Sequence, residues 1–167
     1  MSCGYHLGGP DVIVEIDETK LGKRKYHRGH RVEGVWILVG VERTTERKVF
    51  VEKVVDRCAS TLEEVIGRHI LPGSIVHTDL WKGYSGLSSN LSLEHRTVNH
   101  LIGFKDHETG VHTNTVEGTN YALKLFIRPR NRTAEVDEHL EEFVWRRKHN
   151  SNLWEVFIEA LKDVHYL

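Results

Sequence analysis

Residues 12 to 18 read VIVEIDE, a β-branched run that ends in acidic residues. Branched apolar residues over this length are typical of a β-strand, so we expect one here. The next two apolar runs, VWILVGVE (35–42) and KVFVEKVVD (48–56), predict two further strands. VWILVGVE is apolar almost throughout, which indicates a strand buried on both faces. The links between the three strands are fairly short, and this favours an antiparallel meander.

After residue 56 the pattern changes to helices that alternate with strands. An apolar stripe at helical spacing begins near Ser60, and Pro72-Gly73 ends it. The order of elements predicts an α/β fold with a mixed five-stranded sheet and flanking helices. The remaining predicted elements are strands at 74–80 and 93–98 and helices near 115–127, 134–148 and 151–163. The predicted domain limits are a lead-in at 1–10, a main domain at 11–150 and a C-terminal helix within 151–167.

The composition limits the classes of function. With 167 residues, 39% hydrophobic and 28% charged, the chain suits one folded domain with a buried core. Its formal net charge of −1 argues against nucleic-acid binding through bulk positive charge, so such binding needs a local basic patch. Cys3 and Cys58 form neither a CxxC pair nor a disulfide framework, which favours a reducing compartment. No apolar run reaches the roughly 18 residues of a membrane span, and we see no secretory signal.

Three acidic residues stand where predicted strands end and a predicted helix begins. Asp17 ends the first strand, Asp79 ends the fourth, and Glu117 lies in the first turn of the helix near 115–127. Ligands of open α/β sheets bind beyond strand ends, and carboxylates are the ligands that Mg²⁺ and Mn²⁺ prefer. If the two strands are neighbours, the acids converge on a metal site.

The spacing around Glu117 has a second interpretation. Asn114-Thr115-Val116-Glu117 has the pattern of a capping box, in which Asn114 caps the helix and Glu117 is its partner. Lys124 lies on the same helical face as Asn114 and Glu117, where it either meets a substrate phosphate or is a solvated charge. His112 either orients a water or a carboxylate or is a structural histidine. The spacing alone leaves these alternatives open.

Several blocks of the sequence resemble one family, in order and over most of the chain. They are VEIDETKLGKRKYHRGHRVEG (14–34), WILVGVER (36–43), TDLWKGY (78–84), VNHLIGFKDHETGVHTNTVEGTNYALK (98–124) and EFVWRRK (142–148). They resemble the catalytic domain of DDE transposases, of the Merlin type and of related bacterial insertion-sequence transposases (ISXO2-like). The resemblance implies an RNase H-like fold for residues 11–150 and metal-dependent cleavage and strand transfer of double-stranded DNA, at transposon ends and target.

The resemblance also assigns roles to individual residues. Asp17, Asp79 and Glu117 match the three family acids, which implies that they are catalytic and hold two Mg²⁺ or Mn²⁺ ions. Asn114 belongs to the same motif as Glu117, and Lys124 matches a basic position that follows it. A homo-oligomer on DNA is implied, without membrane contact. The implied location is the nucleus in a eukaryote and otherwise the cytoplasm or nucleoid.

The chain departs from the family pattern in two respects. A Trp often follows the third acid, but here Gly118, Thr119 and Asn120 follow it. Family members also carry an N-terminal DNA-recognition segment, which we expect this chain to lack because it begins close to the first catalytic strand. Two alternatives are therefore kept: a catalytically silent or domesticated DNA-binding or interaction module, and a structure-selective nuclease of RNase H type.

A basic stretch follows the first predicted strand. The interpretation we favour is contact with the DNA backbone beside Asp17, because lysine and arginine neutralise phosphates. A solvated hairpin tip and a nuclear-localisation signal are the alternatives. The basic residues of the stretch are Lys20, Lys23, Arg24, Lys25, Arg28 and Arg31.

Overall fold

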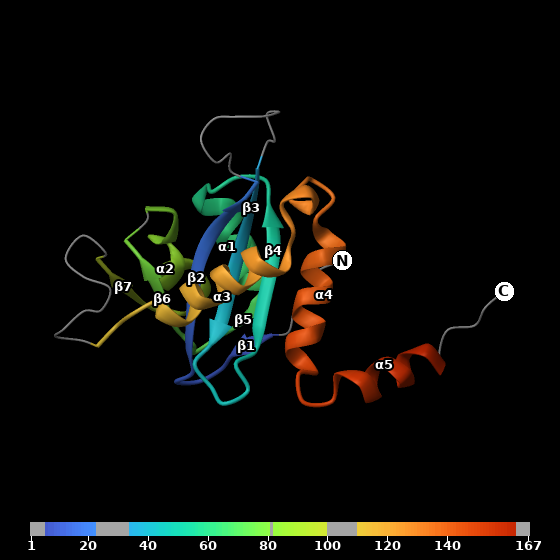
Figure 1. The fold of residues 1–167 in the computed structure, drawn as a ribbon. Helices are drawn as coiled ribbons and strands as arrows, with labels where there is room; N and C mark the ends of the chain where they lie inside the picture. The colour runs from blue at the N-terminus through green and yellow to red at the C-terminus, as the bar shows by residue number, and fades with distance from the viewer. Residues whose placement is uncertain (1–5, 23–33, 81, 100–109, 163–167) are drawn as a thin grey trace.

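A five-stranded sheet with β2 at its centre forms the middle of the molecule (Figure 1). The structure is a computed structural model, and it describes residues 6–22, 34–80, 82–99 and 110–162. The strand order is β4-β3-β2-β6-β7. The strands are β2 (Ile13–Leu21), β3 (Val35–Glu42), β4 (Val49–Val54), β6 (Ile75–Asp79) and β7 (Glu94–Val98).

The sheet is mixed, as the sequence predicted. β2, β3 and β4 form the expected antiparallel meander. β6 pairs with β2 in the parallel sense, and β7 pairs with β6 in the same sense. The register of β2 and β6 matters most for the site, and it sets Glu15 opposite His77.

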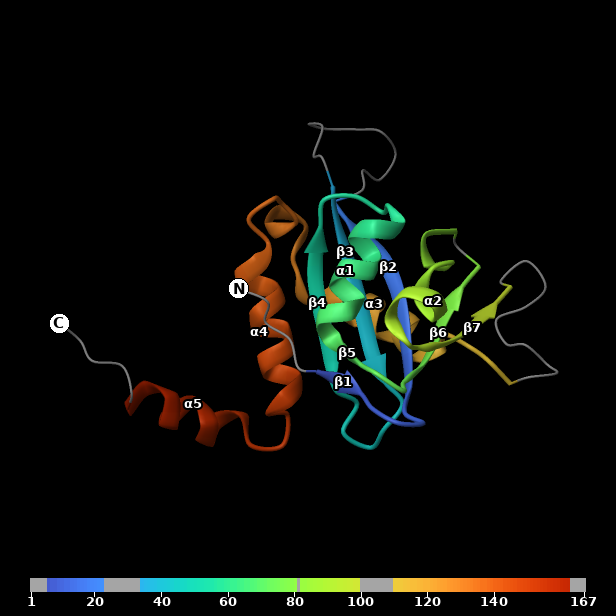
Figure 2. The same ribbon diagram turned by 180° about the vertical axis from the view of Figure 1, so that it is seen from behind.

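Helices cover both faces of the sheet, so that the molecule has three layers (Figures 1 and 2). α1 (Ala59–His69) lies on one face, and α3 (Asn114–Phe126) and α4 (Asp137–Lys148) lie on the other. Side chains that alternate along β3 enter different cores. Leu38 packs in the cluster with α1, whereas Ile37 and Val39 pack in the cluster with α3 and α4. This two-sided burial explains why the β3 sequence is apolar almost throughout.

A second, small sheet involves residues that were expected to be a lead-in. β1 (Leu7–Gly8) pairs in parallel with β5 (Ile70–Leu71), and Leu7 is fully buried in the core on the α1 side. The described part of the lead-in is therefore attached to the domain. The remaining short elements are η1 (Lys82–Tyr84), α2 (Leu87–Leu91) and η2 (Pro129–Asn131).

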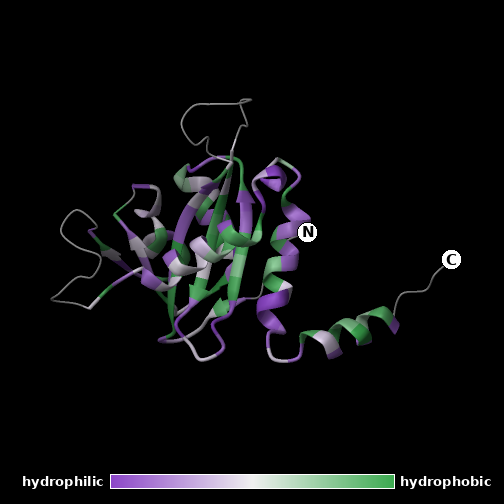
Figure 3. Cartoon of the chain, in the orientation of Figure 1, coloured by the Kyte–Doolittle hydropathy of each residue, from purple (hydrophilic) through white to green (hydrophobic). Residues whose placement is uncertain are grey.

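The last helix projects from the layered body (Figure 1). α5 (Leu153–Lys162) has no buried residue among its ten, although it is largely apolar (Figure 3). Trp154, Phe157, Ile158 and Leu161 expose their side chains. Within the described ranges, the helices are too short or too polar to cross a lipid bilayer.

Candidate active site

Asp17 lies on the central strand β2 and Asp79 on its parallel neighbour β6. Asp79 is the last residue of β6, as predicted. The prediction that Asp17 ends its strand is wrong, because β2 continues to Leu21 through pairing with β3. Both acids lie two residues beyond the paired residues Glu15 and His77. Side chains two residues apart in a strand point to the same face, so Asp17 and Asp79 share the face that carries α3.

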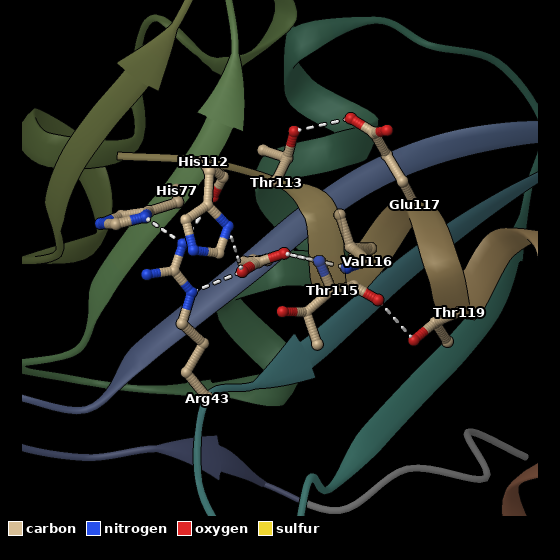
Figure 4. Close-up of polar contacts among 9 residues, drawn as sticks. Arg43, His77, His112, Thr113, Thr115, Val116, Glu117 and Thr119 are labelled. Atoms are coloured by element: carbon tan, nitrogen blue, oxygen red, sulfur yellow. Dashed lines mark hydrogen bonds and ion pairs between the residues drawn. The ribbon is translucent and has the colours of Figure 1, made fainter. Parts of the chain in front are cut away.

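Glu117 reaches this face from the first turn of α3. The capping-box interpretation is wrong, because the N-cap is Thr113 and Asn114 is an exposed residue inside the helix. Among the residues described, the Thr113 side chain makes no cap hydrogen bond to the helix backbone. Its hydroxyl instead donates to Oε1 of Glu117 at 3.0 Å (Figure 4). The side chain of Glu117 is therefore turned toward the loop before α3 rather than toward an Asn114 cap.

Asn120 joins the acids, and sequence reasoning gave it no role. It is buried on α3, and its Nδ2 donates to Oδ2 of Asp17 at 2.8 Å. Its Oδ1 has no hydrogen-bond partner among the described residues. Asn120 stands three residues after Glu117, a helical spacing that places both on one face and that could have identified it. A carbonyl oxygen and several carboxylate oxygens form a hard donor set of the kind that suits Mg²⁺ or Mn²⁺.

The electrostatics of Asp17 also fit a cation. Burial first, and then the carboxylates of Glu18, Asp79 and Glu117, together raise the pKa of Asp17 from 3.8 to about 7. The hydrogen bond from Asn120 therefore does not offset the cost of charging Asp17, and a bound cation would do so. Within the described part of the chain, no three His, Cys, Asp or Glu residues are gathered closely enough to hold a metal ion.

A cleft of about 290 Å³ opens beside Asp17, Glu117 and Asn120. Lys124, which is exposed, lines it together with these residues, as the shared helical face predicted. Asp79 is outside the lining of this cleft. The cleft therefore brings together two of the three predicted acids, the amide that contacts one of them, and the predicted basic residue.

A buried carboxylate two residues before Asp17 on β2 was also not predicted from the sequence. Glu15 on β2 is fully buried, and its Oε2 accepts hydrogen bonds from the backbone amides of Thr115 (2.7 Å) and Val116 (2.9 Å). Its Oε1 pairs with Nε of Arg43 at 2.5 Å. Glu15 thus caps α3 from a distant strand, because a carboxylate satisfies the free amides at a helix N-terminus. The signal in the sequence was an acid inside the apolar run VIVEIDE.

Arg43 extends this cap into a network with two histidines (Figure 4). Its Nη2 donates to the backbone oxygen of His112 at 2.7 Å and lies 3.2 Å from Nδ1 of His77. Burial, followed by the charge of Arg43, lowers the pKa of His77 to about 4, so His77 is neutral near pH 7. Nδ1 of His112 lies 3.4 Å from Glu15. We call Glu15, Arg43, His77 and His112 the Glu15–Arg43 network.

The sequence matches the family described as the ISXO2-like transposase domain over residues 6–152. The chain belongs to this family. The match confirms the resemblance and spans the described elements from β1 to α4, ending before α5. Membership implies a transposase-type function with DNA as the substrate, and transposases of the DDE type generally use divalent metal ions. No curated protein matches the chain.

The basic stretch of this transposase domain is described only at its start. Lys20 is exposed near the end of β2, and its Nζ lies 5.3 Å from the ring centroid of Trp36 on β3. The other predicted DNA contacts, Lys23, Arg24, Lys25, Arg28 and Arg31, lie outside the described residues.

Proposed function

We propose that this chain is a DDE transposase catalytic domain with an RNase H-like fold, which cleaves DNA phosphodiesters and transfers the resulting strand with the help of divalent metal ions. The observation that carries the proposal is the register of β2 and β6 within a chain of a transposase family. That register sets Asp17 and Asp79 on one sheet face, and Glu117 comes to the same face from α3.

Asp17, Asp79 and Glu117 would hold two Mg²⁺ or Mn²⁺ ions, which when bound activate the attacking oxygen and stabilise the leaving oxygen. Asn120 fixes the orientation of the Asp17 carboxylate through its amide. Lys124, at the cleft but two helical turns from Glu117, neutralises the charge of the DNA backbone. Lys20 lies over Trp36 on the α1 side of the sheet, three residues after Asp17, so it would meet DNA apart from the cleft.

The test compares cleavage and strand transfer on end-labelled duplex DNA in Mg²⁺ or Mn²⁺. The variants are Asp17→Asn, Asp79→Asn and Glu117→Gln, and the matched control is Glu138→Gln, an exposed acid on α4. We expect activity in the native chain and in the control, and its loss in the three variants. A folded chain that binds DNA but cleaves nothing at any metal concentration would contradict the proposal and favour the silent binding module. Cleavage without strand transfer would favour the simple nuclease.

A further inference from the structure

The Glu15–Arg43 network involves residues that stand one or two positions before each of the three acids in the sequence. Glu15 precedes Asp17 by two residues on β2, and His77 precedes Asp79 by two residues on β6. On α3, the amides of Thr115 and Val116 that bind Glu15 directly precede Glu117. One set of partly buried contacts therefore joins the two strands and the helix that carry the acids (Figure 4).

The attachment of α3 depends on a charge from outside the helix. The N-cap Thr113 directs its hydroxyl to Glu117, so the cap comes from the fully buried Glu15 carboxylate. This carboxylate also lies at the positive end of the helix dipole, where a negative charge is favourable. A buried carboxylate needs a partner of opposite charge, and Arg43 provides it.

Arg43 suits this place because its guanidinium is planar and forked. Its Nε contacts Glu15 while its Nη2 contacts the His112 backbone and lies beside His77. A lysine ammonium carries the same charge on a single atom and cannot reach these partners in the same geometry. The contact with His112 holds the chain just before α3, and the contact with His77 holds β6.

We propose that Glu15 and Arg43 are positioning residues of the active site, which fix the start of α3 against β2 and β6 and so set the separation of Glu117 from Asp17 and Asp79. This inference rests on the proposed function for its catalytic consequence. The physical attachment of α3 is a property of the metal-free protein and is measured without catalysis.

The experiment uses the whole chain with Arg43→Lys, which keeps the charge and loses the fork. The double variant Glu15→Gln/Arg43→Gln removes both charges together and leaves no unpaired buried ion, which protects the fold. The control is Arg68→Lys, because Arg68 pairs with Glu52 at 2.5 Å between α1 and β4, away from the acids. Three quantities are measured: amide hydrogen exchange in EDTA, Mn²⁺ affinity by titration, and DNA cleavage.

We expect the amides of Thr115 and Val116 to exchange at least tenfold faster in both network variants while the β3 amides stay protected. We also expect Mn²⁺ to bind about 10–100-fold more weakly, the range found for residues that orient metal ligands, with cleavage recovering at high Mn²⁺. The control keeps native exchange at these amides and native Mn²⁺ affinity.

Folded network variants with native exchange at α3 and native Mn²⁺ affinity would overturn the inference. A native chain that neither binds Mn²⁺ nor cleaves DNA would instead refute the proposed function. In that case faster exchange at Thr115 and Val116 still supports the positioning of α3, and unchanged exchange still overturns it.

Discussion

Replacing Asp17 by Asn is expected to stabilise the metal-free protein at alkaline pH. Burial, followed by the neighbouring carboxylates of Glu18 and Asp79, raises the pKa of Asp17 from 3.8 to about 7. The folded state therefore holds the Asp17 proton more tightly than the unfolded chain does. The free energy of unfolding consequently falls as the pH rises from about 4 to about 7, where Asp17 becomes charged in the folded protein.

The magnitude follows from the two pKa values. Each pH unit between them corresponds to about 1.4 kcal/mol, so a fully charged Asp17 lowers the free energy of unfolding by at most about 4 kcal/mol. Between pH 5 and pH 8 the loss is about 2–3 kcal/mol by the same relation. Asn nearly keeps the shape of the side chain and can accept the hydrogen bond from Asn120. The substitution therefore removes the charge while it preserves the contact.

The assay is urea unfolding in EDTA at pH 5 and pH 8. The advantage of Asp17→Asn over the native chain should grow between these two values. Asp56→Asn is the control, because the Cys58 backbone amide lowers the pKa of Asp56 below 3.8; its stabilising charge is already present at pH 5, so the effect of this substitution should not change between pH 5 and pH 8. Saturating Mg²⁺ should shrink the advantage of Asp17→Asn at pH 8 by compensating the native carboxylate. An advantage that does not change with pH in EDTA would refute the reasoning.

Three further predictions concern two glycine positions, the DNA contact of Lys124 and the packing of α5. Gly118 lies on α3, and a Cβ added there would meet no described atom within 4 Å, so Gly118→Ala should raise the free energy of unfolding by about 1 kcal/mol. Gly40→Ala should instead lower it by about 1–3 kcal/mol, because its Cβ would lie 2.1 Å from the Phe50 ring. Urea unfolding measures both, and equal effects would contradict the argument. Lys124→Ala should weaken DNA binding in Ca²⁺ and reduce the log–log salt slope by about 1, and an unchanged slope would place Lys124 off the DNA. A chain without residues 153–167 should unfold within about 0.5 kcal/mol of the full chain, because α5 buries none of its side chains; a larger loss, measured by thermal unfolding, would show that α5 packs on the body.

Local periodicity was sufficient to predict most of the secondary structure. A strand alternates with period two and a helix with period 3.6, and both periods are carried by neighbouring residues. The strand that ends at Asp79, the helix that holds Glu117 and the antiparallel meander could be predicted for this reason. The end of β2 could not be predicted, because its last residues, up to Leu21, are held in the strand by pairing with β3. Pairing with a separate strand leaves no local signal.

The sequence by itself thus determined the class of fold and which acids lie on or beside its central strands. Only the tertiary structure decided how those acids are held. Glu15 contacts an amide 100 residues away, and Asn120 reaches across 103 residues to Asp17. The cap of α3 was predicted from a local pattern at Asn114, and it comes instead from β2. A buried polar group takes whichever partner the packed chain brings within about 3 Å, and spacing along the sequence carries no information about a partner so far away.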